Sequence, residues 1–398
     1  MARSFLRKLS CRLQAAFIDH YKERFRETAD VRLLPLDYRS GVIDLEENYR
    51  TSSPFIEAEL WMTIKSCRGD RAPRPDGFTL EFFKKIWNIV RRDLLKACDE
   101  FYISGFVPDC IARTFLPLVP KREAVEFVND YRPISLIGSI NKIVSKMLIA
   151  RLQPLMDKVV SFHQFDGVRG RQIHEANLIA NELVDSRRKS GNSGILLKLD
   201  IDKAFDSASW SCLFSIVKSM GFNSKWVKWI KGIVSASKVS VLVNGEASGY
   251  FGMSRSFKQG DPLSPFFFNL VMNVLSFMLQ KIAAAGYLSG FCMNEKQRLG
   301  EVTHLFYADD PLLFCDAEED QMINVLVALI WFQSVTGLKI NLDKSKLMWV
   351  MLIMWKDLLI FLAVNGMSSP QSTLVSHWAP LLHLQVCGIE SLIRCKSD

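Results

Sequence analysis

The chain has 398 residues, 49% of them hydrophobic, so it can bury a core large enough for at least two subdomains. The 50 Lys and Arg residues against 42 Asp and Glu give a net charge of +8, which favours a polyanionic partner without identifying one. The nine cysteines form no Cys-x-x-Cys pair, which argues against a disulfide framework or a zinc site. We therefore expect a reducing, intracellular location, nuclear or cytoplasmic.

The amino-terminal part is predicted to be helical with linkers. Residues 1–14 are basic but lack the apolar stretch of a secretory signal, and a mitochondrial-type presequence stays open. Large apolar side chains recur at helical spacing in residues 16–25, whereas residues 30–51 show little periodicity and are predicted to be a surface connection. Ser53 followed by Pro54 predicts the N-cap and first position of the next helix.

Helices and short strands alternate in the next part of the chain. A turn-rich cluster ends at residue 78 and precedes an amphipathic helix predicted over residues 80–90. Residues 115–121 and 131–136 resemble the paired finger strands that close over the incoming nucleotide in a family of polymerases. The helix that follows carries basic side chains near one edge, which suits either a nucleic-acid backbone or an ordinary solvated face: Lys142, Lys146 and Arg151.

Three acidic residues stand at the ends of short apolar segments. Residues 194–199 are predicted to be a buried strand that ends at Asp200, and residues 303–315 a hairpin whose turn holds Asp309 and Asp310. Adjacent carboxylates repel one another unless they retain a proton or share a divalent cation. Mg²⁺ bound by carboxylates and substrate phosphates is the arrangement used in nucleotidyl transfer, so this pattern predicts such a site.

Two glycine-containing segments are suited to contact a nucleic acid. Arg169 and Arg171 flank a glycine that allows close approach to phosphates. Gln259 can both donate and accept hydrogen bonds, and Gly260 permits close backbone approach to a base pair. A long helix is predicted to start directly afterwards and to run to about residue 285.

With these motifs the chain resembles, over about residues 17–346, the reverse transcriptases of plant LINE-type, non-LTR retrotransposons. The resemblance implies an α+β right-hand polymerase fold, with fingers and a palm whose antiparallel sheet is backed by helices, and with a thumb that is absent or degenerate. It implies an RNA-directed DNA polymerase that uses an RNA template, a DNA primer and deoxynucleoside triphosphates, with no membrane. Oligomeric state is left open.

The same resemblance implies domain boundaries and residue roles. The N-terminal region would span residues 1–60, an N-terminal extension of the fingers 61–114, the fingers and palm 115–346, and a degenerate tail 347–398. The implied ligands of two Mg²⁺ ions, with Mn²⁺ as a substitute, are Asp200, the Ile201 carbonyl, Asp309 and Asp310. The residues implied at the incoming nucleotide are Lys121, Arg132, Phe205, Gln259 and Gly260, and those at the template are Arg169 and Arg171.

Two of the implied roles are chemical. Lys344 would lie near the triphosphate and protonate the leaving pyrophosphate. Phe205 would lie beneath the sugar, where its ring excludes a ribose 2′-hydroxyl, so an RNA-dependent RNA polymerase is disfavoured.

The sequence also departs from the family pattern. The departures are Arg74 for Gly, Asp166 and Gly167 for a small residue and an aromatic, Lys258 for Arg, and Pro311 for Thr. They keep open a second hypothesis, a catalytically inactive retroelement remnant that at most binds nucleic acid. Pro311 in particular lacks the N–H that a strand residue contributes to a hairpin ladder.

The resemblance is expected to stop after Lys346. The tail is apolar in two stretches, each too short to span a membrane. A reading-frame change near Val350 explains it better, because codons for residues 373–380 can be chosen so that the neighbouring frame reads Tyr-Leu-Gly-Leu-Pro-Leu-Gly-Ala, the segment that follows the palm in this family.

Overall fold

The computed structural model of the chain describes residues 2–27, 34, 38, 41–68, 75–236, 238–294 and 299–350. The predictions for Arg74 and for the tail beyond Val350 lie outside these residues.

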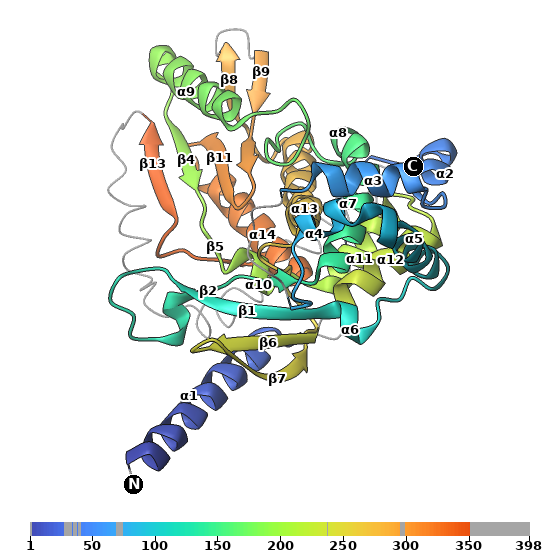
Figure 1. Ribbon diagram of the computed structural model, residues 1–398. Helices are drawn as coiled ribbons and strands as arrows, with labels where there is room; N and C mark the ends of the chain where they lie inside the picture. Colours follow the sequence, from blue (N-terminus) through green and yellow to red (C-terminus); the bar gives the residue numbers. More distant parts are fainter. Residues whose placement is uncertain are drawn as a thin grey trace.

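A four-stranded antiparallel sheet, in the order β10–β11–β4–β13, forms the palm. Its strands are β4 (Gly194–Lys198), β10 (His304–Tyr307), β11 (Asp310–Asp316) and β13 (Lys346–Val350). Helix α9 (Ile173–Ser190) contacts β10 and β13, and helix α14 (Glu319–Thr336) contacts β11. Helix α13 (Ser264–Ala284) packs on α14, toward the helical part of the molecule (Figure 1).

A second sheet, in the order β2–β1–β6–β7 with β3 also paired to β1, forms the fingers. Its strands are β1 (Arg113–Pro120), β2 (Tyr131–Pro133), β3 (Leu136–Ile137), β6 (Lys238–Val243) and β7 (Glu246–Gly252). Only β1 and β6 among these pairs run parallel. Helix α1 (Ala2–Arg24) reaches this sheet with its carboxyl end and contacts β6 and β7 (Figure 1).

Shorter elements complete the described chain. The helices are α2 (Leu45–Thr51), α3 (Glu57–Ser66), α4 (Leu80–Lys85), α5 (Trp87–Ser104), α6 (Asp109–Ala112), α7 (Ser139–Leu152), α8 (Met156–Val159), α10 (Ala204–Ser207), α11 (Trp210–Ser219) and α12 (Ser224–Ser235), with 3₁₀ turns η1 (Val128–Asp130) and η2 (Gln153–Leu155). Two small sheets pair β5 (Ile201–Asp202) with β12 (Lys339–Ile340) and β8 (Phe291–Asn294) with β9 (Leu299–Val302).

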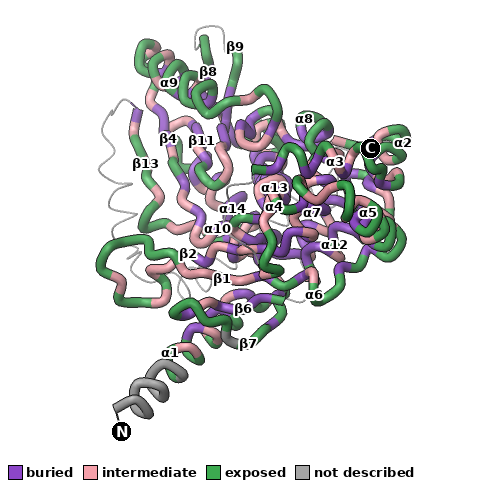
Figure 2. Tube along the Cα trace, viewed as in Figure 1, coloured by how far each residue is buried: buried purple, intermediate pink, exposed green. Residues whose placement is uncertain are grey.

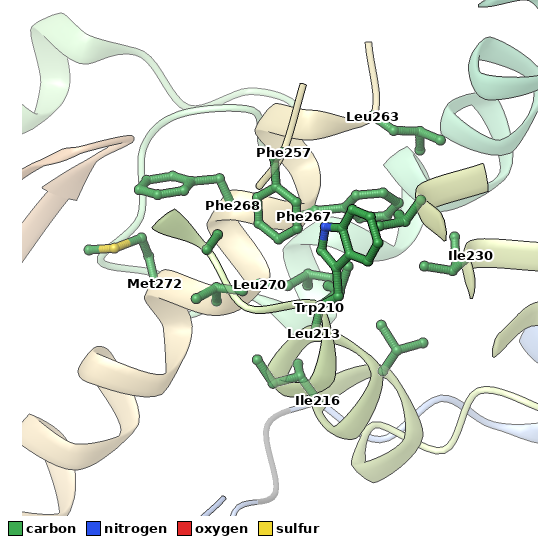
Figure 3. Packing of buried hydrophobic residues seen from close by; sticks show 14 of the residues in the cluster. Trp210, Leu213, Ile216, Ile230, Phe257, Leu263, Phe267, Phe268, Leu270 and Met272 are labelled. Carbon is green, nitrogen blue, oxygen red and sulfur yellow. The ribbon is translucent and has the colours of Figure 1, made fainter. Parts of the chain in front are cut away.

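Helix α13 lies at the centre of the core. Its Phe267 and Phe268 are buried, and Phe257 and Trp210 belong to the same buried cluster (Figure 3). Buried positions gather between the palm sheet and helices α7 and α12 (Figure 2). Burying one aromatic side chain contributes about 1.5–3 kcal/mol. Helix α13 is long and apolar enough to cross a membrane, but 67% of the qualifying window is buried inside the fold, which accounts for its composition.

Two local predictions for the N-terminal region are wrong. The predicted surface connection contains α2, which begins at a capping box formed by Asp44 and Glu47. Ser53 and Pro54 do not start a helix, because α3 begins three residues later. The physical reason is tertiary: the Arg151 guanidinium donates hydrogen bonds to the carbonyls of Ser53 (2.6 Å) and Pro54 (3.1 Å).

Arg151 is therefore an internal residue. Its guanidinium also donates two 2.7 Å hydrogen bonds to the Glu59 carboxylate and lies 4.3 Å from the centre of the Phe55 ring. Neither of the two alternatives left open for it, a face toward a nucleic-acid backbone or an ordinary solvated face, describes Arg151 in the structure. The predicted domain boundary at residue 114 falls inside β1 and stays a prediction.

Candidate active site

The predicted metal-binding acids lie at neighbouring ends of β4 and of the β10–β11 hairpin. Tyr307 pairs with Asp310, which leaves Ala308 and Asp309 as a two-residue turn. Ala308, at the first turn position, has a positive φ of 51°, as the tight turns of two-residue hairpins require there. The predicted hairpin is confirmed, although Asp310 begins β11 instead of sharing the turn. Because β11 pairs with β4, the hairpin end lies beside Asp200.

The carboxylates repel one another. Partial burial raises the pKa of Asp309, and the charges of Asp310 and Asp200 raise it further, so the three groups are close. Their oxygen atoms are the donors that Mg²⁺ prefers. Within the described ranges, however, no three acidic, His or Cys side chains converge as they stand to hold an ion. One oxygen of Asp310, Oδ1, instead forms an ion pair with the Lys198 ammonium at 3.1 Å.

A turn between β12 and β13 supports Asp200. The Asp200 N–H donates to the Ser345 hydroxyl (3.1 Å), and the Asp200 carbonyl accepts from the Asn341 N–H (2.8 Å). Lys344 stands in this turn and is exposed, so it lies next to the support of Asp200. Ile201 is buried and pairs with β12. The roles implied for Lys344 and for the Ile201 carbonyl stay predictions.

A lysine of the fingers and a lysine of the palm donate hydrogen bonds to the same residue, Asn129. Lys121 follows β1 and Arg132 lies on the paired strand β2, and both are exposed. The Lys121 ammonium donates to the Asn129 carbonyl (2.8 Å), and the Lys203 ammonium donates to the Asn129 side-chain oxygen (3.1 Å). Lys203 was not predicted as a site residue. Its local sequence does not distinguish it from a solvated lysine among acidic residues. In the structure its φ of 50° marks an unusual backbone conformation.

Asp206 and Gln259 form a buried link beneath this site. Asp206 pairs with Arg24 at the end of α1 and accepts a 3.1 Å hydrogen bond from the Gln259 amide. Burial raises the pKa of Asp206, and the Arg24 guanidinium opposes that shift. The Gln259 amide N–H is therefore already engaged by Asp206. Phe205 is half-buried and stacks on Phe268 with ring centres 4.9 Å apart.

The segment around Gly260 is fixed by the protein itself. Gly260 has a φ of 104°, and a Cβ there would lie 3.0 Å from the Ser135 carbonyl oxygen, so the neighbouring backbone requires the glycine. Lys258 is buried, and its ammonium has no hydrogen-bond partner among the described residues. Burial lowers the pKa of Lys258 and raises that of the nearby Asp261.

The predicted template loop is held by one of its own arginines. Arg171 donates to the carbonyls of Ser161 (2.6 Å) and Gln164 (2.8 Å) and pairs with Asp157. The structure thus gives Arg171 a role inside the loop, contrary to the predicted grip on the template, whereas Arg169 is exposed.

The same loop contacts the turn formed by Ala308 and Asp309, called the catalytic turn below. The Gln164 side-chain oxygen accepts from the N–H of Asp166 (3.1 Å) and of Ala308 (3.2 Å). Burial raises the pKa of Asp166, and the Asp309 charge raises it further, so a fourth carboxylate lies near the site. Gln164 was not predicted to matter, because no local pattern indicates a contact between residues 144 positions apart.

Comparison with known families decides the assignment. The family model described as reverse transcriptase (RNA-dependent DNA polymerase) matches residues 119–371. The chain belongs to this family. The reverse transcriptase segment is similar to the Transposon TX1 uncharacterized 149 kDa protein of Xenopus laevis, with 27% identity over 308 residues, 76% of this chain and 23% of that protein.

Pol polyproteins of retrotransposable elements are also similar to this reverse transcriptase. The type-1 element R2 protein of Popillia japonica is 27% identical over 74% of this chain and 39% of its own length. The type-2 element R2DM protein of Drosophila melanogaster is 26% identical over 69% of this chain and 24% of its own length. The chain thus spans between 23% and 39% of the length of these relatives.

These matches confirm the predicted family and the α+β fold of fingers and palm. Reverse transcriptases generally use divalent metals, a nucleic-acid template and deoxynucleoside triphosphates. One expectation is corrected: the family match continues to residue 371, beyond the predicted end at Lys346. The plant origin stays a prediction.

Proposed function

We propose that this chain carries the polymerase site of a non-LTR retrotransposon and adds deoxynucleotides to a DNA primer on an RNA template. The observation that carries the proposal is the placement of Asp309 and Asp310 at the end of a hairpin beside Asp200. Asp200, Asp309, Asp310 and the Ile201 carbonyl would hold two Mg²⁺ ions, or Mn²⁺. Bound ions of this kind activate the primer hydroxyl and neutralise phosphate charge during in-line displacement.

The other residues have distinct proposed tasks. Lys121, Arg132 and Lys203 would bind the triphosphate oxygens; Lys121 and Lys203, which now donate to the neutral Asn129, would be released when an anion arrives. Lys344 would protonate the leaving pyrophosphate, and Arg169 would contact the template backbone. For Phe205 we propose the sugar-facing position, with the ring held from behind by Phe268.

The test is primer extension on an RNA template, with and without Mg²⁺. Asp309→Asn should lower extension at least about 100-fold, since the carboxylate serves the metal, and should leave the affinity for template–primer within about twofold. Asp185→Asn, a change at an exposed helix position, is the matched control and should behave as wild type. Equal loss of binding and extension in Asp309→Asn contradicts the proposed role.

A second candidate is a catalytically inactive remnant that binds nucleic acid. It is favoured by the unpartnered buried ammonium of Lys258 and by the extra charge of Asp166 beside Asp309. Template binding without any extension in Mg²⁺ or Mn²⁺ would support this candidate against the first.

A further inference from the structure

The catalytic turn is held from outside its own hairpin. In a two-residue turn, the N–H of the first turn residue points away from the hairpin and needs another acceptor. Here the Gln164 side-chain oxygen accepts from that N–H, at Ala308, over 3.2 Å. Ala308 is also a non-glycine residue at a φ of 51°, a conformation that persists only where its surroundings enforce it.

The backbone around Gln164 is fixed to the same hairpin. The Phe165 N–H donates to the Phe306 carbonyl (2.9 Å), and the Phe306 N–H donates to the His163 carbonyl (2.8 Å). This segment therefore pairs with β10 like an extra strand. The Gln164 backbone lies beside Phe306, and its side chain extends along the hairpin to Ala308. Only the oxygen end of the amide can face the two N–H groups of Ala308 and Asp166, so the orientation of the side chain is determined.

The side-chain amide of Gln164 is energetically unfavourable at its nitrogen end. Gln164 is buried, and its side-chain nitrogen makes no hydrogen bond within the described part of the chain. A buried donor without a partner is unfavourable, and an apolar side chain of similar length would avoid it. The oxygen end, with its two hydrogen bonds, is what distinguishes glutamine from such a side chain.

From this geometry we propose that Gln164 is a positioning residue for Asp309, and that it couples the template loop to the catalytic turn. The inference rests on the proposed polymerase function. Asp309 directly follows Ala308, so a turn that loses its outside acceptor can relax toward ordinary backbone angles and displace the carboxylate. The loop that supplies the acceptor also carries the exposed Arg169. If the loop moves when a template binds, the Gln164 side chain transmits that displacement to Ala308 and Asp309.

The decisive variant is Gln164→Met, which keeps the length and removes the acceptor. Gln153→Met, at an exposed position in η2, is the matched control. Amide hydrogen exchange in residues 305–310 and Mn²⁺ affinity, measured by proton relaxation, report on the turn without any catalysis. Gln164→Met should speed exchange about tenfold and weaken Mn²⁺ binding several-fold, and the control should match wild type. Gln164→Glu, which restores an acceptor, should return the exchange rate toward that of wild type.

Primer extension then separates this inference from the proposed function. In an active chain, Gln164→Met should lower kcat about tenfold and leave the KM for the nucleotide and the affinity for template–primer within about twofold. Binding of template–primer should slow exchange at Ala308 in wild type and have less effect in the variant. An inactive wild type refutes the proposed function, yet the exchange and Mn²⁺ measurements still apply. Exchange and Mn²⁺ affinity equal to wild type in Gln164→Met overturn the inference.

Discussion

At the scale of single residues, Ser256 has a backbone conformation that suits glycine. It has a φ of 93°, it is buried, and its backbone is held at both ends. Its N–H donates to the Ala208 carbonyl (2.9 Å), and its carbonyl accepts from the Trp210 indole (2.7 Å). The chain cannot relax here without breaking these hydrogen bonds.

Ser256→Gly is therefore expected to stabilise the protein. Relief of the strained φ is worth about 1–3 kcal/mol, and the greater freedom of glycine in the unfolded chain offsets part of it, so a net gain of about 1 kcal/mol should appear in the free energy of unfolding. Urea denaturation measures it. Ser193→Gly, at a position without positive φ, is the control and should be neutral or destabilising. A loss of stability in Ser256→Gly would refute the strain argument.

At the scale of elements, Pro311 shortens the pairing between β11 and β4. The sequence predicts that its missing N–H weakens the hairpin ladder with β10. In the structure the Pro311 carbonyl accepts from the Leu199 N–H (3.0 Å). Because the N–H and the carbonyl of one residue in an antiparallel strand point toward the same neighbouring strand, the missing N–H lies on the side of β4. The regular pairing of these strands ends one residue earlier, at Leu312 and Lys198. The weakened contact is the one next to Asp200.

Pro311→Thr should add the missing donor opposite Leu199 and raise primer extension several-fold. The reason is that one more hydrogen bond between β11 and β4 would fix Asp310 relative to Asp200. Pro311→Ala separates the causes, since it restores the N–H without a β-branched side chain. Both variants should raise the rate if the donor is what matters. Rates equal to the Pro311 chain in both would show that the proline is tolerated.

The edge of the palm also contains a pH-sensitive pair of histidines. The His163 and His304 rings lie with their centres 4.1 Å apart and are tilted by 37°, and the His163 carbonyl accepts a hydrogen bond from the Phe306 N–H on β10. Burial, with a smaller effect of the Arg171 charge, lowers the pKa of His163 to about 4, and burial lowers that of His304 in the same direction. Both rings are neutral in the folded protein at pH 7.

Stability should fall as the pH drops from about 6.5 toward 4, because the unfolded chain takes up these protons and the folded chain does not. His163 alone accounts for about 2–3 kcal/mol over that window. Urea unfolding at pH 7.5, 6 and 5 measures the slope, and His163→Gln should reduce it, since the variant loses the contribution of His163 and the His163 charge that acts on His304. An identical slope in His163→Gln would exclude this histidine as the cause.

At the scale of the whole molecule, β13 is the edge strand of the palm sheet and the last described element. The sequence after it predicts a change of reading frame near Val350, with an apolar tail that promotes aggregation, whereas the family match to residue 371 contradicts a change before that residue. The coding nucleotide sequence checks this directly: the shifted frame across residues 373–380 should spell Tyr-Leu-Gly-Leu-Pro-Leu-Gly-Ala. Any other translation of that frame removes the prediction.

The sequence by itself determined the elements that carry the chemistry. Apolar runs of strand length around Asp200 and around Asp309 predict the palm strands and their hairpin, and the apolar composition of residues 264–284 predicts the central helix. These signals are local, because side-chain periodicity and turn residues act within a few positions of the chain.

Only the tertiary structure decided which polar groups remain available for a substrate. Arg151 and Arg171 resemble cations that bind nucleic acid, yet protein acceptors engage both: a distant segment engages Arg151, and its own loop and Asp157 engage Arg171. Gln164 has no marked sequence context, yet it reaches the catalytic turn. The physical reason is that a hydrogen bond depends on distance and direction in space, so partners separated by many residues are set by the packing of whole elements and leave no local pattern.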